Sequence, residues 1–402
     1  MTRHNNLIIG QSGGATAVIN ASLVGAVEAA LADERIDGIY GMRYGIKGFL
    51  REDLIDLRQQ PSSIWPRLLH TPSAALGSCR YQLKDENLER VIAILRRYTI
   101  HYLLYIGGND SADTAHRLSK GAERVGYDLH TISIPKTIDN DLPFTDHCPG
   151  YGSAARFLAL ATMDSTMNTI SIPSHYPVKV IETMGRDAGW LAASSALGKR
   201  SYVDPPHIIL MPEQRFNAER FLRQVQDVYR QLGYVVVVAA ETIRDEQGQP
   251  IGSIGQAGMD AFHHPLLSGA GQYLVELVIQ HLKLRARFDK PGDLQRMASN
   301  SISRTDHEEA YLVGKMGTNA LLDGESDKMI TLVRHPEPAY HCTTGLMELA
   351  KVANEQRLMP EDYLDESKIM VSEAFYDYAL PLIGDPLPKY PQLEEIRIKR
   401  DE

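Results

Sequence analysis

Residues 131–141 read TISIPKTIDND, and this stretch decides how the chain is interpreted. Its first part, Thr131–Ile134, is short and rich in β-branched residues, as in a buried strand. A lysine, a threonine and two aspartates follow at once, and Asp139 and Asp141 are two residues apart. If this part is extended, both carboxylates point to the same side. We therefore predict a strand that ends in a loop carrying paired acidic groups.

The same order of apolar run, polar loop and helix recurs along the chain, which is typical of βαβ units on a parallel sheet. Ligands bind such sheets at the carboxyl ends of the strands. No repeat or flexible linker separates the units. The predicted fold class is therefore α/β, with two interleaved three-layer domains, mostly parallel sheets and ligand sites at the carboxyl ends of strands. The further strands are expected at residues 7–9, 102–106, 178–181, 207–211 and 234–240, and the helices at 17–31, from about 111, and up to 197.

Composition excludes several classes of protein. A formal net charge of −9 over 402 residues argues against nonspecific nucleic-acid binding, which needs a basic surface. No apolar run approaches the ~20 residues that cross a bilayer. The three cysteines, Cys79, Cys148 and Cys342, fit neither a disulfide framework nor a zinc site. We therefore expect a cytoplasmic protein without membrane or nucleic-acid partners.

Two glycine-containing turns are candidate phosphate or metal sites. Gly13 and Gly14 lie between a predicted strand and helix, where backbone N–H groups can bind an anion. The same residues would serve in an ordinary turn, and they match neither a dinucleotide fingerprint nor a P-loop. In the second turn, 107–111, Asn109 and Asp110 offer oxygen ligands for Mg²⁺. Alternatively, Asp110 or Ser111 simply caps the next helix.

Phosphoryl transfer explains the residues of 136–141 better than a solvated acidic turn does. One carboxylate can accept the proton of an attacking hydroxyl, and the other can help to hold a metal. Lys136 adds a cation against the phosphoryl oxygens.

An ordered set of motifs is similar to the phosphofructokinase family. The set comprises the glycine turn, LGSxR at 76–80, GGND at 107–110, PKTIDND at 135–141, MGR at 184–186, and Gln295-Arg296, over about residues 7–320. The resemblance implies that residues 1–145 with about 297–345 bind the phosphoryl donor, and that 146–296 with about 346–402 bind a sugar phosphate. It also implies Mg²⁺ as cofactor and a homodimer or homotetramer with shared active sites.

The resemblance assigns roles to individual residues. It implies that Asp139 is the general base, and that Thr137 and Arg186 act on the transferring phosphoryl group. Asn109 and Asp141 match metal positions. The donor is expected to contact Gly14, Arg80, Asp110 and Lys136, and the sugar phosphate to contact Met184, Gly185, Glu241, Arg296 and, from a neighbouring subunit, Arg287.

Asp110 indicates which donor is used. The pyrophosphate branch of the family resembles GGDD followed by PKTIDND, whereas the ATP branch has glycine in place of Asp110. A carboxylate there would fill the space of the nucleotide's α-phosphate and repel it, and two like charges about 4 Å apart cost roughly several kcal/mol. We therefore predict reversible transfer from pyrophosphate to the 1-hydroxyl of fructose 6-phosphate.

Three departures from the family pattern leave alternatives open. Asn109 stands where the family usually has a metal-binding aspartate, and Asp293 stands where it often has a histidine. Pro177 stands where the ATP enzymes have an arginine for the sugar phosphate, and Lys179 is a candidate to take over the role of that arginine. The alternatives are an ATP-dependent phosphofructokinase, a sedoheptulose 7-phosphate kinase, and a non-catalytic regulatory subunit that binds a sugar phosphate.

Overall fold

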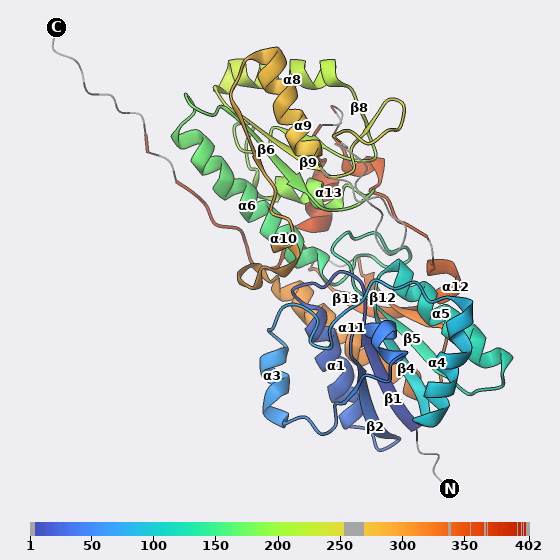
Figure 1. Ribbon diagram of the computed structural model, residues 1–402. Coiled ribbons are helices and arrows are strands. Elements are labelled where there is room, and N and C mark those ends of the chain that lie inside the picture. Colours follow the sequence, from blue (N-terminus) through green and yellow to red (C-terminus); the bar gives the residue numbers. More distant parts are fainter. Residues whose placement is uncertain are drawn as a thin grey trace.

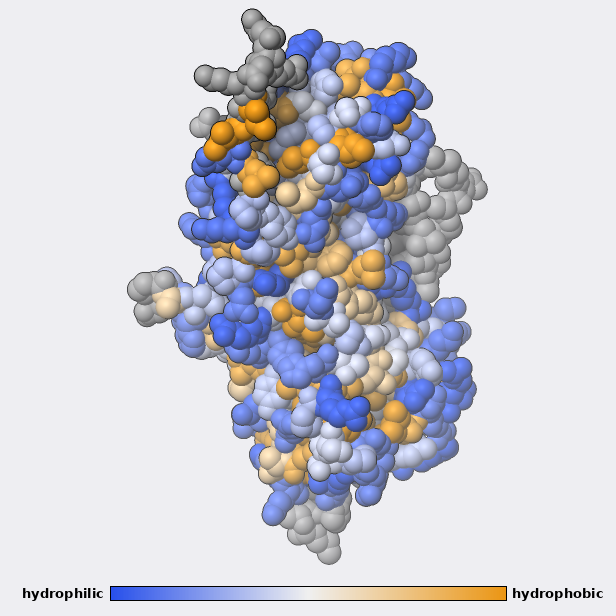
Figure 2. Space-filling view, turned by 90° about the vertical axis from the view of Figure 1, so that its left-hand side faces the viewer, coloured by the Kyte–Doolittle hydropathy of each residue, from blue (hydrophilic) through white to orange (hydrophobic). Residues whose placement is uncertain are grey.

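The computed structural model describes residues 5–252, 269–336, 339–353, 355–365, 367, 369–391, 393, 394, 396 and 398. It shows an elongated molecule with two lobes, each built around its own sheet (Figure 1). The N-terminal strands lie in the lower lobe of this view. On the face shown in Figure 2, hydrophobic residues form separate patches among hydrophilic ones.

The lower lobe contains a seven-stranded sheet. Its strand order is β13 (Cys342–Glu348), β12 (Lys328–Arg334), β5 (His130–Pro135), β4 (Ile100–Gly107), β1 (Asn5–Gln11), β2 (Ile36–Met42) and β3 (Leu54–Asp56). The two outermost strands run antiparallel to their neighbours, and the others are parallel.

Alternation of side chains along β1 creates the layers of this lobe. Leu7 and Ile9 pack with α1 (Ile19–Leu31) and α11 (Arg304–Leu322) on one face. Ile8 points to the other face and packs with α4 (Asp85–Arg97), α5 (Asn109–Arg124) and α12 (Leu349–Val352). Because these helices cover the faces of the sheet, the carboxyl ends of its strands stay uncovered and can form a site.

The upper lobe has a four-stranded parallel sheet with its own helices on both faces. Its strand order is β11 (Ala286–Asp289), β6 (Val178–Thr183), β9 (Val235–Ala240) and β7 (Ile208–Leu210). Alternate valines of β9 pack with α6 (Tyr151–Ser171), α7 (Trp190–Ser194) and α13 (Glu373–Ala379) on one side, and with α8 (Ala218–Leu232) and α9 (Ala270–Leu277) on the other. Such continuous valine runs are typical of strands buried on both faces.

The remaining elements of the two lobes are short. They are α2 (Gly45–Phe49), α3 (Trp65–Leu68), α10 (Leu294–Met297) and the paired β8 (Arg215–Phe216) and β10 (Arg244–Asp245), besides short 3₁₀ turns and a π-helical turn.

The structure confirms the predicted α/β class with interleaved three-layer units and mostly parallel sheets. Every predicted strand is present, and the chain crosses between the lobes more than once, since β12 and β13 return to the first sheet. Strands β2, β3, β8, β10, β11, β12 and β13 were not predicted. Among the described residues, no helix has the length and apolar character needed to span a bilayer.

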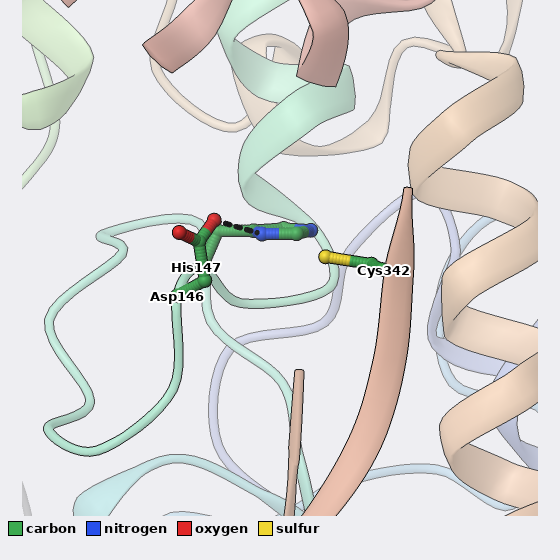
Figure 3. A group of neighbouring side chains, drawn as sticks. All are labelled: Asp146, His147 and Cys342. Carbon is green, nitrogen blue, oxygen red and sulfur yellow. Dashed lines mark hydrogen bonds and ion pairs between the residues drawn. The ribbon is translucent and has the colours of Figure 1, made fainter. Parts of the chain in front are cut away.

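A buried imidazole lies where the chain passes from the first lobe to the second. His147 follows β5; its Nδ1 lies 2.8 Å from Asp146 Oδ1, and its Nε2 lies 2.6 Å from Glu309 Oε2 on α11. Figure 3 shows the Asp146 carboxylate on one side of the ring and the Cys342 thiol on the other. Asp146 also pairs with Arg334 at 3.1 Å. Because ion pairs already engage both ring nitrogens and the Asp146 carboxylate, we interpret this cluster as an ion-pair network and not as a metal site.

The network predicts that stability falls in alkaline solution. Burial lowers the pKa of His147, but Glu309 and Asp146 outweigh burial and raise it to about 9, above the ordinary 6.5. The stabilisation is therefore fully present below pH 6.5 and is lost as pH rises through 9, a change of roughly 3 kcal/mol in the free energy of unfolding. Urea unfolding between pH 6 and pH 9.5 measures this slope. The variant His147→Gln should show a flatter slope, and equal slopes would contradict the assignment.

Candidate active site

A cavity of about 470 Å³ lies between the two lobes, where the carboxyl ends of both sheets meet. Every predicted site residue lines it except Gly185 and Arg287. Its lining is Gly13, Gly14, Ala15, Arg80, Gly108, Asn109, Asp110, Ser111, Lys136, Thr137, Ile138, Asp139, Asp141, Met184, Arg186, Asp187, Glu241, Thr242, Arg244, Arg296, Glu355 and Gln356. Loops far apart in sequence thus converge on one space, as expected for parallel sheets.

The first glycine turn lies beside Arg296 and is bonded to the segment that carries Arg80. A Cβ atom on Gly14 would lie 2.5 Å from a guanidinium nitrogen of Arg296, so the lack of a side chain lets this guanidinium lie directly beside the turn. The Gly13 N–H donates to Cys79 O at 3.2 Å, and Ser78 Oγ donates to Gly13 O at 2.6 Å. These bonds hold the segment that carries Arg80 against the turn.

The second turn supplies an amide oxygen that lacks a partner. Helix α5 begins at Asn109 with Gly108 as its N-cap and has no side-chain cap, so capping by Asp110 or Ser111 is not what these residues do. The Oδ1 atom of Asn109 is buried and accepts no hydrogen bond. Buried polar atoms are rarely left unpaired, and oxygen ligands suit Mg²⁺. Asn109 therefore offers an oxygen ligand that suits a divalent cation, and Asp141 lines the same cavity.

The paired aspartates lie in a loop after β5, as predicted, but the loop turns and is not extended, so strand alternation is not what orients the two carboxylates. Asn140 has a φ of +57°, in the left-handed region that asparagine tolerates better than most residues. Its side chain is fully buried, donates to Tyr378 OH at 2.8 Å and accepts from Cys148 N at 3.0 Å. These tertiary contacts override the alternation expected of a strand. Both Asp139 and Asp141 nevertheless face the cavity.

Burial and neighbouring charges tune the groups of this loop. Burial, followed by the charge of Asp141, raises the pKa of Asp139 to about 6. Burial lowers the pKa of Lys136 to about 8, and its Nζ donates to Gly14 O at 2.7 Å. Arg186 Nε lies 3.8 Å from Asp139 Oδ2. A carboxylate with a pKa just below neutrality, within reach of cations, suits general-base catalysis.

The loop after β6 is fixed from both sides. Gly185 has a φ of +135°, and a Cβ atom there would lie 2.8 Å from Ala188 O, so the turn requires glycine. The N–H of Arg186 donates to Glu241 Oε1 at 3.4 Å, and Thr242 Oγ1 donates to Arg186 O. Burial raises the pKa of Glu241 to about 7, with Asp139 adding to the effect. Gly185 thus shapes the loop that brings its two neighbours to the cavity.

The predicted sugar-phosphate contacts have mixed outcomes. Arg296 lines the cavity, and Asp293 Oδ1 binds its guanidinium at 2.7 and 3.1 Å, which gives Asp293 its local role. Lys179 does not line the cavity and pairs with Asp289 at 2.7 Å, so it does not substitute for the missing arginine there. Arg287 lies on the edge strand β11, exposed, with its guanidinium 3.6 Å from the ring centre of Tyr176.

Sequence reasoning missed several lining residues. Asp187 directly follows Arg186, and Arg244 lies three residues after Glu241; the two pair at 3.0 Å. Because both are close in sequence to predicted site residues, their positions could have indicated that they line the cavity. Glu355 and Gln356 come from a segment without any motif. Gln356 Nε2 donates to Asp141 Oδ2 at 3.4 Å.

Comparisons with known proteins agree with these motifs. Residues 6–319 match the family described as phosphofructokinase. The chain is 39% identical to a pyrophosphate–fructose 6-phosphate 1-phosphotransferase of Halomonas elongata, covering all of this chain and 98% of the relative. It is 41% identical to the protein of that name from Methylococcus capsulatus, covering 96% and 93%. A solved pyrophosphate-dependent phosphofructokinase from Marinobacter aquaeolei superposes with a TM-score of 0.86 at 37% identity, covering 97% and 94%.

Proposed function

The chain belongs to the phosphofructokinase family, and from this we propose that it moves a phosphoryl group from pyrophosphate to the 1-hydroxyl of fructose 6-phosphate. The products are fructose 1,6-bisphosphate and orthophosphate. The observation that carries the choice of donor is the carboxylate of Asp110 in the wall of the cavity. Relatives that bear this activity in their names are 39% and 41% identical over nearly the full length of the chain, which supports this choice of donor.

The proposed mechanism places the base and the cations around the transferred group. Asp139 takes the proton of the 1-hydroxyl as its oxygen attacks phosphorus, and the bond to the leaving orthophosphate breaks. Arg80, Lys136 and Arg186 stabilise the charge on the phosphoryl oxygens. Thr137 Oγ1 accepts the N–H of Asp139 at 3.0 Å and so orients the base.

The opposite wall of the cavity holds the sugar phosphate in this proposal. Glu241 receives sugar hydroxyl groups, Met184 and Gly185 shape the contact surface, and Arg296 binds the 6-phosphate. We predicted a donor domain of 1–145 with about 297–345 and a sugar domain of 146–296 with about 346–402. Because β13 and α12 pack in the lower lobe, we place the last boundary after Val352 and not near 345. Because the cleaved and formed bonds are similar in energy, the reaction is readily reversible.

We propose Mg²⁺ as the cofactor, held by Asn109 and Asp141. When bound, it offsets negative charge on the phosphoryl oxygens. The unpartnered, buried Oδ1 of Asn109 supports this assignment.

We also propose a homo-oligomer located in the cytoplasm. The exposed Arg287 on the edge strand β11 supports a contribution to the active site of a neighbouring subunit, because it does not reach the cavity of its own chain. Three free cysteines support a reducing compartment.

A comparison of donors tests the proposed function. With fructose 6-phosphate and Mg²⁺ supplied, we expect the initial rate with pyrophosphate to exceed that with ATP by about 100-fold or more. The reason is that the Asp110 carboxylate repels the α-phosphate of ATP. A chelator should stop the reaction, and fructose 1,6-bisphosphate with orthophosphate should drive it backwards. Strict use of ATP would overturn the donor assignment.

A further inference from the structure

A short segment without a sequence motif joins the two walls of the cavity. We call residues 356–359, Gln356-Arg357-Leu358-Met359, the strap. It follows α12 of the lower lobe and leads towards α13 of the upper lobe. Its contacts attach it to the aspartate loop on one side and to the segment after Arg186 on the other.

Arg357 binds the main chain of the aspartate loop at several points. Its own N–H donates to Asp141 O at 2.7 Å, and its Nη2 donates to Asn140 O at 2.9 Å. Its Nη1 donates to Thr145 O at 2.8 Å and to Asp146 O at 2.5 Å. The planar guanidinium offers several fixed donors, so one side chain can satisfy these carbonyls together. The side chain therefore fixes the loop through its backbone and leaves both carboxylates available to the cavity.

The other end of the strap is attached to the sugar side. Trp190 Nε1 donates to Arg357 O at 3.3 Å, and the Arg357 guanidinium lies 4.6 Å from the Trp190 ring centre. The N–H groups of Met359 and Gly189 both donate to Glu213 Oε1, at 3.0 and 2.8 Å. Gly189 is three residues beyond Arg186. One carboxylate thus joins the strap to the loop that meets the sugar.

We propose that the strap sets the position of the Asp139–Asp141 loop relative to the Met184–Arg186 loop, with Arg357 as the positioning residue. The kinetic part of this proposal rests on the proposed function, because it assumes that the hydroxyl lies on one wall and the base on the other. Transfer rates depend steeply on such alignment, since a shift of about 1 Å can cost roughly 100-fold.

The test compares Arg357→Met with Arg334→Met. Methionine at 357 keeps an apolar stem on Trp190 but removes every donor of the guanidinium. Arg334 is a matched control, because it also contacts Asp146 and Tyr378 but, among the described residues, makes no hydrogen bond to Asn140 or Asp141. Hydrogen exchange with mass spectrometry measures how fast the backbone amides of residues 137–148 exchange, and steady-state kinetics measures kcat and KM.

We expect Arg357→Met to speed exchange in residues 137–148 without changing exchange in the buried strand β9. Its kcat should fall about 100-fold while both KM values stay within about threefold. Arg357→Lys should recover part of kcat, because one ammonium reaches some of the carbonyls. Arg334→Met should leave exchange in 137–141 and kcat near those of the unmodified chain.

Two outcomes would overturn the proposal. In the first, Arg357→Met keeps slow exchange in 137–148 and a kcat within threefold of the unmodified chain. In the second, exchange rises equally throughout the chain, which would show that Arg357 only stabilises the fold. If Arg357→Met does not fold, Arg357→Lys is judged by the same readouts. Exchange decides the role of the strap even if the unmodified chain proves inactive with pyrophosphate.

Discussion

Replacing Asp139 by asparagine should lower kcat by roughly 10³- to 10⁴-fold, near the upper end of what a general base contributes. The amide keeps the size of the side chain and cannot accept the proton of the 1-hydroxyl. Binding of fructose 6-phosphate should stay within about threefold, because other residues of the cavity hold the sugar. Initial rates and calorimetric titration with fructose 6-phosphate measure the two effects separately.

Asp164→Asn is a suitable control for this experiment. Asp164 lies on α6, accepts a hydrogen bond from Tyr390 and does not line the cavity. It should leave kcat unchanged. Full activity of Asp139→Asn would refute the assignment of Asp139 as the general base. If the unmodified chain itself bound the sugar phosphate but never turned over, the regulatory-subunit alternative would hold.

Asp110→Gly should raise kcat/KM for ATP by about 100-fold, or ~3 kcal/mol, and lower the activity with pyrophosphate. Asp110 lies in the first turn of α5 and faces the same cavity as Gly14 and Lys136. Glycine removes both the volume and the charge that oppose a nucleotide α-phosphate. Initial rates with each donor at fixed fructose 6-phosphate measure the change.

A second substitution separates the two parts of this exclusion. Asp110→Ala removes the charge but keeps a Cβ atom, so it should gain less ATP activity than glycine if volume matters. Equal gains would assign the exclusion to charge alone. No gain in either variant would refute the idea that Asp110 excludes nucleotides.

Much of the site was predictable because its chemistry is local in sequence. Gly14, Lys136, Asp139 and Glu241 each directly or closely follow an apolar run, and parallel strands bring such ends together. The sequence pattern therefore predicts most of the charged residues that line the cavity. The short distance from strand to polar residue leaves little freedom in where these side chains can lie.

The remainder depended on contacts between distant parts of the chain. The conformation of the aspartate loop depends on Asn140 meeting Tyr378, and these residues are separated by 238 positions. No local pattern reports such a pair. Likewise, β13 lies at the edge of its sheet and contains only half-buried and exposed residues, so it lacks the buried run that marks the inner strands.

The placement of Arg357 and Tyr378 also has a consequence for synthesis on the ribosome. Both are translated after α11, when the residues proposed to bind pyrophosphate have already been synthesised. Amino-terminal segments fold first during translation. A nascent chain would therefore carry its reactive groups before the residues that align them, and the aspartate loop could take its final conformation only after Tyr378 has been translated.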